Sequence, residues 1–188
     1  MARHEDPIRA QRPTYALADP FLQFHYAVLG PHRSLFRDRQ PRELWVRRLA
    51  AVFDSRVRGP VFEDITRTWV RRYAAVTTLG GPADHIGRSS AVVEGVEREL
   101  DLVVAGAEDA ATPPSDRPVH AIGEAKAGET AGPNHLRALE TARTALGPRA
   151  AHAKILLFAA GFTQDLQAQA ANRADVELVD LDRLYHGE

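Results

Sequence analysis

The sequence contains no cysteine, one methionine and only two lysines. The absence of cysteine excludes disulfide bonds, thiol catalysis and cysteine-based zinc sites. No stretch approaches the roughly 18 to 20 apolar residues that a membrane span requires. The N-terminal residues, Met-Ala-Arg-His-Glu-Asp-Pro, lack the apolar region of a secretory signal peptide. We therefore expect a non-membrane protein of the cytoplasm.

Several well-known motifs are also missing. There is no G-x-x-x-x-G-K-[ST] pattern, so we expect neither a P-loop nor a nucleotide cofactor. The eight histidines form no H-x-x-x-H or H-x-x-E-H pair, which argues against zinc hydrolase chemistry. No G-x-S-x-G or G-x-G-x-x-G occurs, so an α/β-hydrolase or a dinucleotide enzyme has no support. The remaining composition, 44% hydrophobic and 26% charged, is that of a globular protein with a buried core.

Charge is distributed unevenly along the chain. Residues 1–74 carry a net charge of +6 and residues 75–188 a net charge of −7, although the whole chain has a formal net charge of −1. This asymmetry suits a polyanion-facing surface beside a metal-binding one, and equally two solvated faces that partly pair with each other. It permits a nucleic-acid partner without establishing one.

The positions of proline and the spacing of apolar residues divide the chain into three parts. Residues 1–14 are polar with two prolines and are predicted to be a disordered lead-in. Residues 15–58 show helical periodicity and predict an N-terminal helical segment. Residues 59–188 are predicted to form an α/β domain. Its first helix follows Gly59-Pro60, a pair expected to break the preceding helix.

Short strands and helices alternate in the predicted α/β domain. The strands are expected at 75–79, 91–94, 99–104, 119–126, 154–159 and 176–179, the helices at 134–146 and 163–173, and a polar turn at the end of the chain. Strands that are separated by helices imply crossover connections. We therefore expect an α/β fold with a mixed central sheet and helices on both faces.

Three charged residues fall on two neighbouring predicted strands: Asp101 in ELDLVV, and Glu124 and Lys126 in GEAKAG. Strand side chains alternate with period two, so Glu124 and Lys126 project to the same side. If the two strands pair antiparallel, the Asp101 carboxylate can lie beside that of Glu124. Two carboxylates are hard oxygen ligands for Mg²⁺ or Mn²⁺, and an ammonium on the same face can stabilise a phosphorane-like transition state. The pattern favours phosphodiester hydrolysis.

A fourth candidate residue, Glu63, lies early on the helix that precedes the sheet, and Asp64 could take its place if the helix were rotated. Arginine makes up 22 of the 24 basic residues, so a lysine at position 126 suits a task that needs a compact ammonium. The alternative interpretation is an ordinary exposed ion pair between Glu124 and Lys126, with Asp101 as an outward residue of an edge strand.

The order of helix Glu, strand Asp and then Glu-x-Lys resembles the PD-(D/E)xK nuclease-like superfamily. More narrowly, the chain is similar to the DUF234 region at the C-terminal end of certain prokaryotic AAA-type (archaeal-ATPase-like) proteins. The matching segments are YALADPFLQFHY (15–26), VFEDI (61–65), HIGRSS (85–90), ELDLVV (99–104), GEAKAG (123–128) and KILLFAAGFTQDL (154–166).

This resemblance implies a restriction-endonuclease-like fold and Mg²⁺ or Mn²⁺ as the cofactor. It implies that Asp101, Glu124 and the Ala125 carbonyl are metal ligands, that Lys126 is the catalytic lysine and that Glu63 is an accessory acid. DNA is the implied substrate, and a homodimer remains open. Because the family's ATPase portion is absent, the alternative is a non-catalytic DNA-binding or interaction module that partners an ATPase on another chain.

Overall fold

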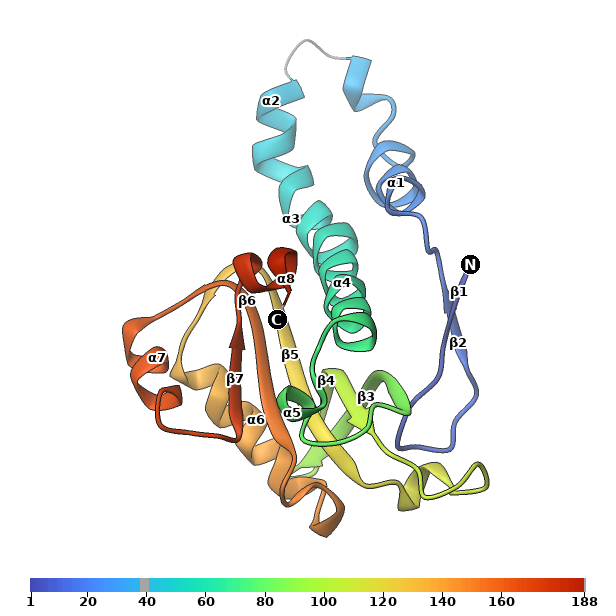
Figure 1. Cartoon of the computed structure of the whole chain (residues 1–188). Coiled ribbons are helices and arrows are strands. Elements are labelled where there is room, and N and C mark those ends of the chain that lie inside the picture. Colours follow the sequence, from blue (N-terminus) through green and yellow to red (C-terminus); the bar gives the residue numbers. More distant parts are fainter. Residues whose placement is uncertain (38–40, 188) are drawn as a thin grey trace.

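The central element of the computed structural model, which describes residues 1–37 and 41–187, is a five-stranded mixed sheet (Figure 1). Its strands, in spatial order, are β3 (His85–Val93), β4 (Val96–Ala105), β5 (Val119–Ala131), β6 (Lys154–Phe162) and β7 (Val176–Val179). The pairs β3–β4 and β4–β5 are antiparallel, whereas β5–β6 and β6–β7 are parallel. The prediction of an α/β fold with a mixed sheet is confirmed.

Helices cover both faces of this sheet. They are α4 (Gly59–Arg72), α5 (Val76–Leu79), α6 (Pro133–Ala145), α7 (Gln164–Ala170) and α8 (Leu181–His186), with short 3-10 turns η5 (Pro114–Asp116) and η6 (Pro148–Ala150) in the loops. On one face, Leu136 of α6 and Leu166 of α7 pack into the core. On the other, α4 places Phe62 and Trp69 in the core, where Trp69 meets the Phe158 ring edge to face. The parallel strands are thus buried on both sides, as their apolar sequences predict.

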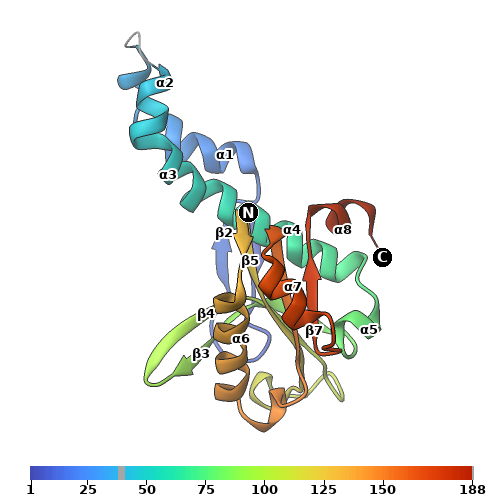
Figure 2. The ribbon, with the colours of Figure 1, turned by 90° about the vertical axis from the view of Figure 1, so that its left-hand side faces the viewer.

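The N-terminal helical segment is a hairpin that extends away from the sheet (Figures 1 and 2). One arm consists of α1 (Pro20–Phe24), the π-helical η1 (His25–Leu29) and η2 (Leu35–Arg37); the other consists of α2 (Pro41–Leu44), η3 (Trp45–Leu49), α3 (Ala50–Phe53) and η4 (Asp54–Arg58). Val28, Leu49 and Val57 are buried between the arms. In the part of the chain described, no helix is long and apolar enough to span a membrane.

The predicted break at Gly59-Pro60 is wrong, because the helix continues from η4 directly into α4. Proline removes one backbone donor and crowds the carbonyl four residues before it. Here Pro60 lies in the first turn of α4 and follows a π-helical turn, in which the Gly59 N–H donates to the Asp54 carbonyl. The wider turn provides a local adjustment of the helix next to the proline.

Two further elements differ from their prediction. The apolar run at 75–79, expected to be a strand, contains the short helix α5, which ends at Gly80 in the left-handed conformation (φ 77°). A short buried run is equally compatible with either element, and its periodicity cannot decide between them. The expected C-terminal turn is the helix α8, which begins where the Asp180 side chain accepts a hydrogen bond from the Arg183 N–H.

The N-terminal lead-in, predicted to be disordered, is ordered in the structure. Strand β1 (Ala2–His4) pairs antiparallel with β2 (Thr14–Ala16), and the intervening segment crosses the edge strand β3. At the crossing, a Cβ on Gly87 would lie 2.6 Å from the Glu5 carbonyl oxygen, so only glycine permits this close approach. Beyond it Ile8 is 1% exposed and packs in the sheet core. The segment therefore packs over the face of β3.

Replacing Ile8 with alanine is expected to lower the free energy of unfolding by about 2–5 kcal/mol, because it deletes a fully buried side chain. The matched control is Ile65→Ala, which removes the same atoms from a position on α4 that is 47% exposed and is expected to cost no more than about 0.5 kcal/mol. Urea unfolding monitored by tryptophan fluorescence provides both values. Equal, small losses would contradict the docking of the N-terminal segment.

Candidate active site at the fork between β4 and β5

Strands β4 and β5 pair over only part of their length and then separate. Leu102 of β4 pairs with Gly123 of β5, and the ladder continues from there toward Ala105. Before Leu102, β4 pairs with β3 alone, and after Gly123, β5 pairs with β6 alone. The β3–β4 ladder has a register shift beside this point, between Gly87 and Ser89 of β3. The two strands thus form a fork, with Asp101 and Glu124 at its base.

Two hydrogen bonds hold Asp101 at this fork, one to its side chain and one to its backbone carbonyl. Its Oδ2 accepts a hydrogen bond from the Ala125 N–H at 2.9 Å, and its carbonyl accepts one from Arg67 Nη1 at 2.6 Å. Burial raises the pKa of the Asp101 carboxyl and the charge of Glu124 raises it further, against the opposing effects of the Ala125 N–H, Lys126 and Arg67. The surroundings of the Asp101 side chain therefore disfavour its ionised form.

Glu124 and Lys126 lie on the same side of β5, as the strand period predicts. Lys126 Nζ is 2.6 Å from Glu124 Oε1, and the two side chains are 31% and 24% exposed. Burial alone would lower the pKa of Lys126, but the hydrogen bond to Glu124 and the charges of Glu124, Asp101 and Glu129 outweigh it and raise that pKa. The ammonium is thus kept charged beside two carboxylates.

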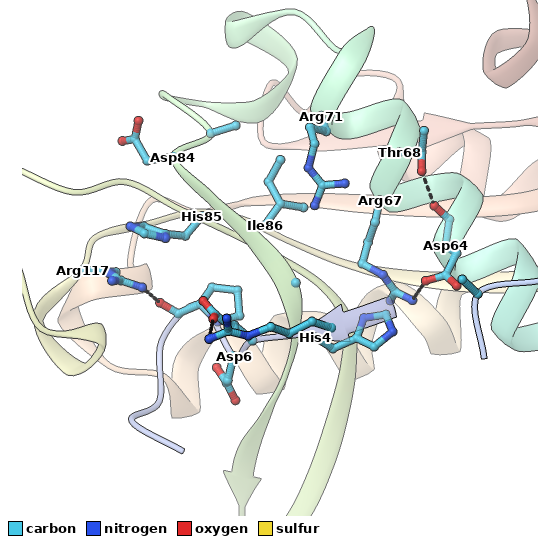
Figure 3. A pocket seen from close by; sticks show the side chains of 16 residues that line it. His4, Asp6, Asp64, Arg67, Thr68, Arg71, Asp84, His85, Ile86 and Arg117 are labelled. Atoms are coloured by element: carbon cyan, nitrogen blue, oxygen red, sulfur yellow. Dashed lines mark hydrogen bonds and ion pairs between the residues drawn. The ribbon is translucent and has the colours of Figure 1, made fainter. Parts of the chain in front are cut away.

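Glu63 faces this group from α4. Burial raises the pKa of Glu63, and the charge of Asp101 raises it further, while Arg67 partly compensates. The Arg67 guanidinium is 3.5 Å from Glu63 Oε2 and donates to Asp64 Oδ1 at 2.7 Å (Figure 3 shows the Asp64 contact). The helix is therefore rotated so that Glu63, and not Asp64, is the acid coupled to Asp101.

A cavity of about 390 Å³ opens beside Asp101 and Glu63. Its lining includes residues that the sequence assigned to a disordered lead-in, namely Asp6, Arg9 and Gln11. Arg9 Nη1 is 2.7 Å from Glu97 Oε1 and also contacts the Ser90 hydroxyl. Sequence reasoning missed these residues, because no local pattern relates position 9 to positions 90 and 97.

The donor set at the fork fits a small divalent cation in charge and in atom type. Mg²⁺ and Mn²⁺ prefer oxygen ligands and are commonly bound by one or two carboxylates together with water. Asp101 and Glu124 supply two carboxylates, and the hydrogen bond from the Ala125 N–H to Asp101 uses Oδ2 and not Oδ1. Among residues 1–37 and 41–187, however, no group of three or more histidines and acids is arranged to hold a metal. A cation here would therefore depend on these two carboxylates, a backbone oxygen and water.

Comparison of the chain with protein-family models, with curated proteins and with solved structures finds no match. The case for chemistry at the fork therefore depends on the arrangement of Glu63, Asp101, Glu124 and Lys126 themselves.

Replacing Asp101 with asparagine is expected to raise the free energy of unfolding by about 1 kcal/mol at pH 7 in the presence of EDTA. The amide oxygen can still accept from the Ala125 N–H, while the buried charge next to Glu63 and Glu124 is removed. Urea unfolding tests this, with the exposed Asp116→Asn as the control that should change stability by no more than about 0.5 kcal/mol. A large loss of stability would instead identify Asp101 as a structural anchor of the strand junction.

Proposed function

We propose that the chain is a divalent-metal-dependent, nuclease-like domain that hydrolyses phosphodiester bonds of DNA. The observation that carries this proposal is the fork, where β4 and β5 separate and leave Asp101, Glu124 and Lys126 as one interacting group. Two neighbouring carboxylates, one of them paired with an ammonium, suit a reaction in which negative charge develops on phosphate oxygens. The PD-(D/E)xK resemblance of the sequence supports the same assignment.

Each residue has a distinct role in this proposal. Asp101, Glu124 and the Ala125 carbonyl would hold Mg²⁺ or Mn²⁺, which when bound lowers the pKa of a coordinated water and neutralises phosphate charge. Lys126 would orient the attacking water or stabilise the additional charge, and its ion pair with Glu124 limits the positions that it samples. Glu63 would assist from α4 as an accessory acid.

The surroundings of the fork support a polyanionic substrate. Arg9 and Arg88 line the cavity that contains Asp101 and Glu63. Arg58 ends η4, and its guanidinium approaches Gly128 of β5 so closely that a Cβ there would be 2.9 Å from Nη1. Residues 1–74, which contribute Arg9 and Arg58, carry the excess of positive charge. Such positive charge provides the sequence-independent part of DNA binding.

A second candidate is a non-catalytic DNA-binding or interaction module that works with an ATPase on another chain. The observation that favours it is the pairing of charges within the site: Lys126 with Glu124, and Arg67 with Asp64 and Glu63. Such pairs stabilise a fold even without a bound cation. This candidate binds DNA without cleaving it and does not require a divalent metal.

Purified protein with Mn²⁺ is expected to nick supercoiled plasmid DNA, and Lys126→Ala is expected to reduce the rate by at least about a hundredfold, because it removes a charge that acts on the transition state. The chain offers a matched control in its only other lysine. Lys154 Nζ is 3.0 Å from Glu177 Oε1 on the neighbouring strand, so Lys154→Ala also breaks a lysine–glutamate pair, but it should leave the rate near that of the wild type.

The outcomes of this assay separate the two candidates. EDTA should abolish nicking by the wild type. Equal nicking by the wild type and Lys126→Ala would assign the activity to a contaminant and overturn the nuclease proposal. Retention of DNA in EDTA, with no cleavage in Mn²⁺, would support the interaction module.

A further inference from the structure

A second cavity, of about 270 Å³, lies between the N-terminal helical hairpin, α4 and α8. Its walls are mainly apolar, with Val61, Ile65 and Leu184 among the lining residues. Polar side chains also line it, among them Gln23 from α1 and Trp69 from α4. None of Asp101, Glu124 and Lys126 belongs to this cavity, so it is separate from the fork.

Gln23 and Trp69 each contain a buried atom without a hydrogen-bond partner among the residues that the structure describes. These atoms are Trp69 Nε1, a donor, and Gln23 Oε1, an acceptor. Trp69 is 2% exposed, and Gln23 is oriented by the hydrogen bond from its Nε2 to the Leu17 carbonyl at 2.6 Å. A buried polar atom that forms no hydrogen bond costs about 1–3 kcal/mol. Two such atoms on side chains that line one cavity leave hydrogen-bonding capacity unmet in its wall.

A third cavity, of about 670 Å³, adjoins the second and shares Ala18, Asp64 and Thr68 with it. Figure 3 shows Arg71 and Arg67 extending from α4 into the space bordered by Ile86 of β3 and by His4. The guanidinium of Arg67 is engaged with Asp64 and with the Asp101 carbonyl. Within residues 1–37 and 41–187, no carboxylate forms an ion pair with Arg71.

The acids that line this third cavity are largely occupied by other groups. Asp6 accepts hydrogen bonds from the Ile8 N–H and the Ser89 hydroxyl, and Asp84 accepts one from the Ala107 N–H. Arg117 donates to the Pro7 carbonyl, while its buried Nε has no partner among the described residues. The cavity therefore contains, in Arg71, a guanidinium that can bind an anionic ligand.

We propose that the two adjoining cavities bind one nucleotide, with its base between Gln23 and Trp69 and its phosphate at Arg71. A nucleobase is flat and largely apolar on its faces and carries hydrogen-bond donors and acceptors on its edge, which matches the second cavity. Phosphate is the preferred anionic partner of a guanidinium. The two volumes together lie within the range of about 300–1,000 Å³ of ligand pockets. This inference does not rest on the nuclease proposal, because it uses no residue of the fork.

Binding is tested by NMR titration of the ¹⁵N-labelled wild-type chain in EDTA with the four 5′-nucleoside monophosphates, their nucleosides and inorganic phosphate. The Trp69 indole N–H is expected to shift, whereas the Trp45 indole, in the helical hairpin, should not. A monophosphate should bind more tightly than its nucleoside. A short single-stranded oligodeoxynucleotide forms a further arm. Tighter binding of the oligonucleotide identifies a strand as the source of the nucleotide, and binding of monophosphates alone identifies a free nucleotide.

Variants assign the two halves of the site. Gln23→Leu, which removes the acceptor at similar volume, should weaken nucleoside binding about tenfold, and the exposed Gln167→Leu should not. Arg71→Ala should reduce monophosphate affinity to that of the nucleoside, whereas Arg72→Ala, next to it on α4 but outside both cavities, should not. Thermal unfolding confirms that each variant folds. No binding at millimolar concentration, binding of inorganic phosphate alone, or binding unchanged in Gln23→Leu would overturn the proposal.

Discussion

The separation of β4 from β5 at Asp101 is the structural constraint on which the candidate site depends. A continuous antiparallel ladder would pair both strands along their lengths and satisfy their backbone groups with one another. Here the side chain of Asp101 replaces part of that ladder, because its Oδ2 accepts the Ala125 N–H. The consequence is a half-buried carboxylate beside Glu124 and Glu63, which is unfavourable for stability but useful for binding a cation. Perturbed carboxyl groups of this kind concentrate at functional sites.

The N-terminal part of the chain completes this arrangement. Residues that precede the sheet cross β3 at Gly87, bury Ile8 in the core and place Arg9 at the cavity beside Asp101. The helical hairpin then adds Gln23 to a second cavity against Trp69. The basic first part of the sequence therefore contacts the sheet through the segment before α1 and through α4, while the hairpin between them extends away from it. Arg9 and Arg67 of this part lie near Asp101.

Much of the sheet and the contact between Glu124 and Lys126 could be predicted from the sequence, because both depend on local periodicity. An apolar run such as Lys154–Phe162 has the pattern of a central strand, and residues 124 and 126 share a face in any strand. The position of the N-terminal segment could not be predicted in this way. Its position depends on tertiary contacts between residues that are far apart in the sequence. Arg9, for example, contacts Ser90 and Glu97, which are more than 80 residues further along the chain. The continuous helix through Pro60 likewise depends on a π-helical turn, for which the sequence contains no clear signal.

The most direct test of the account is to locate a bound divalent ion by paramagnetic broadening of backbone amide signals with substoichiometric Mn²⁺. Two carboxylates at the fork predict that the strongest broadening occurs at residues 100–102 and 123–127, and that Asp101→Asn removes it while the rest of the spectrum is preserved. Broadening that leaves both segments unchanged, or that persists there in Asp101→Asn, would contradict a metal site between β4 and β5.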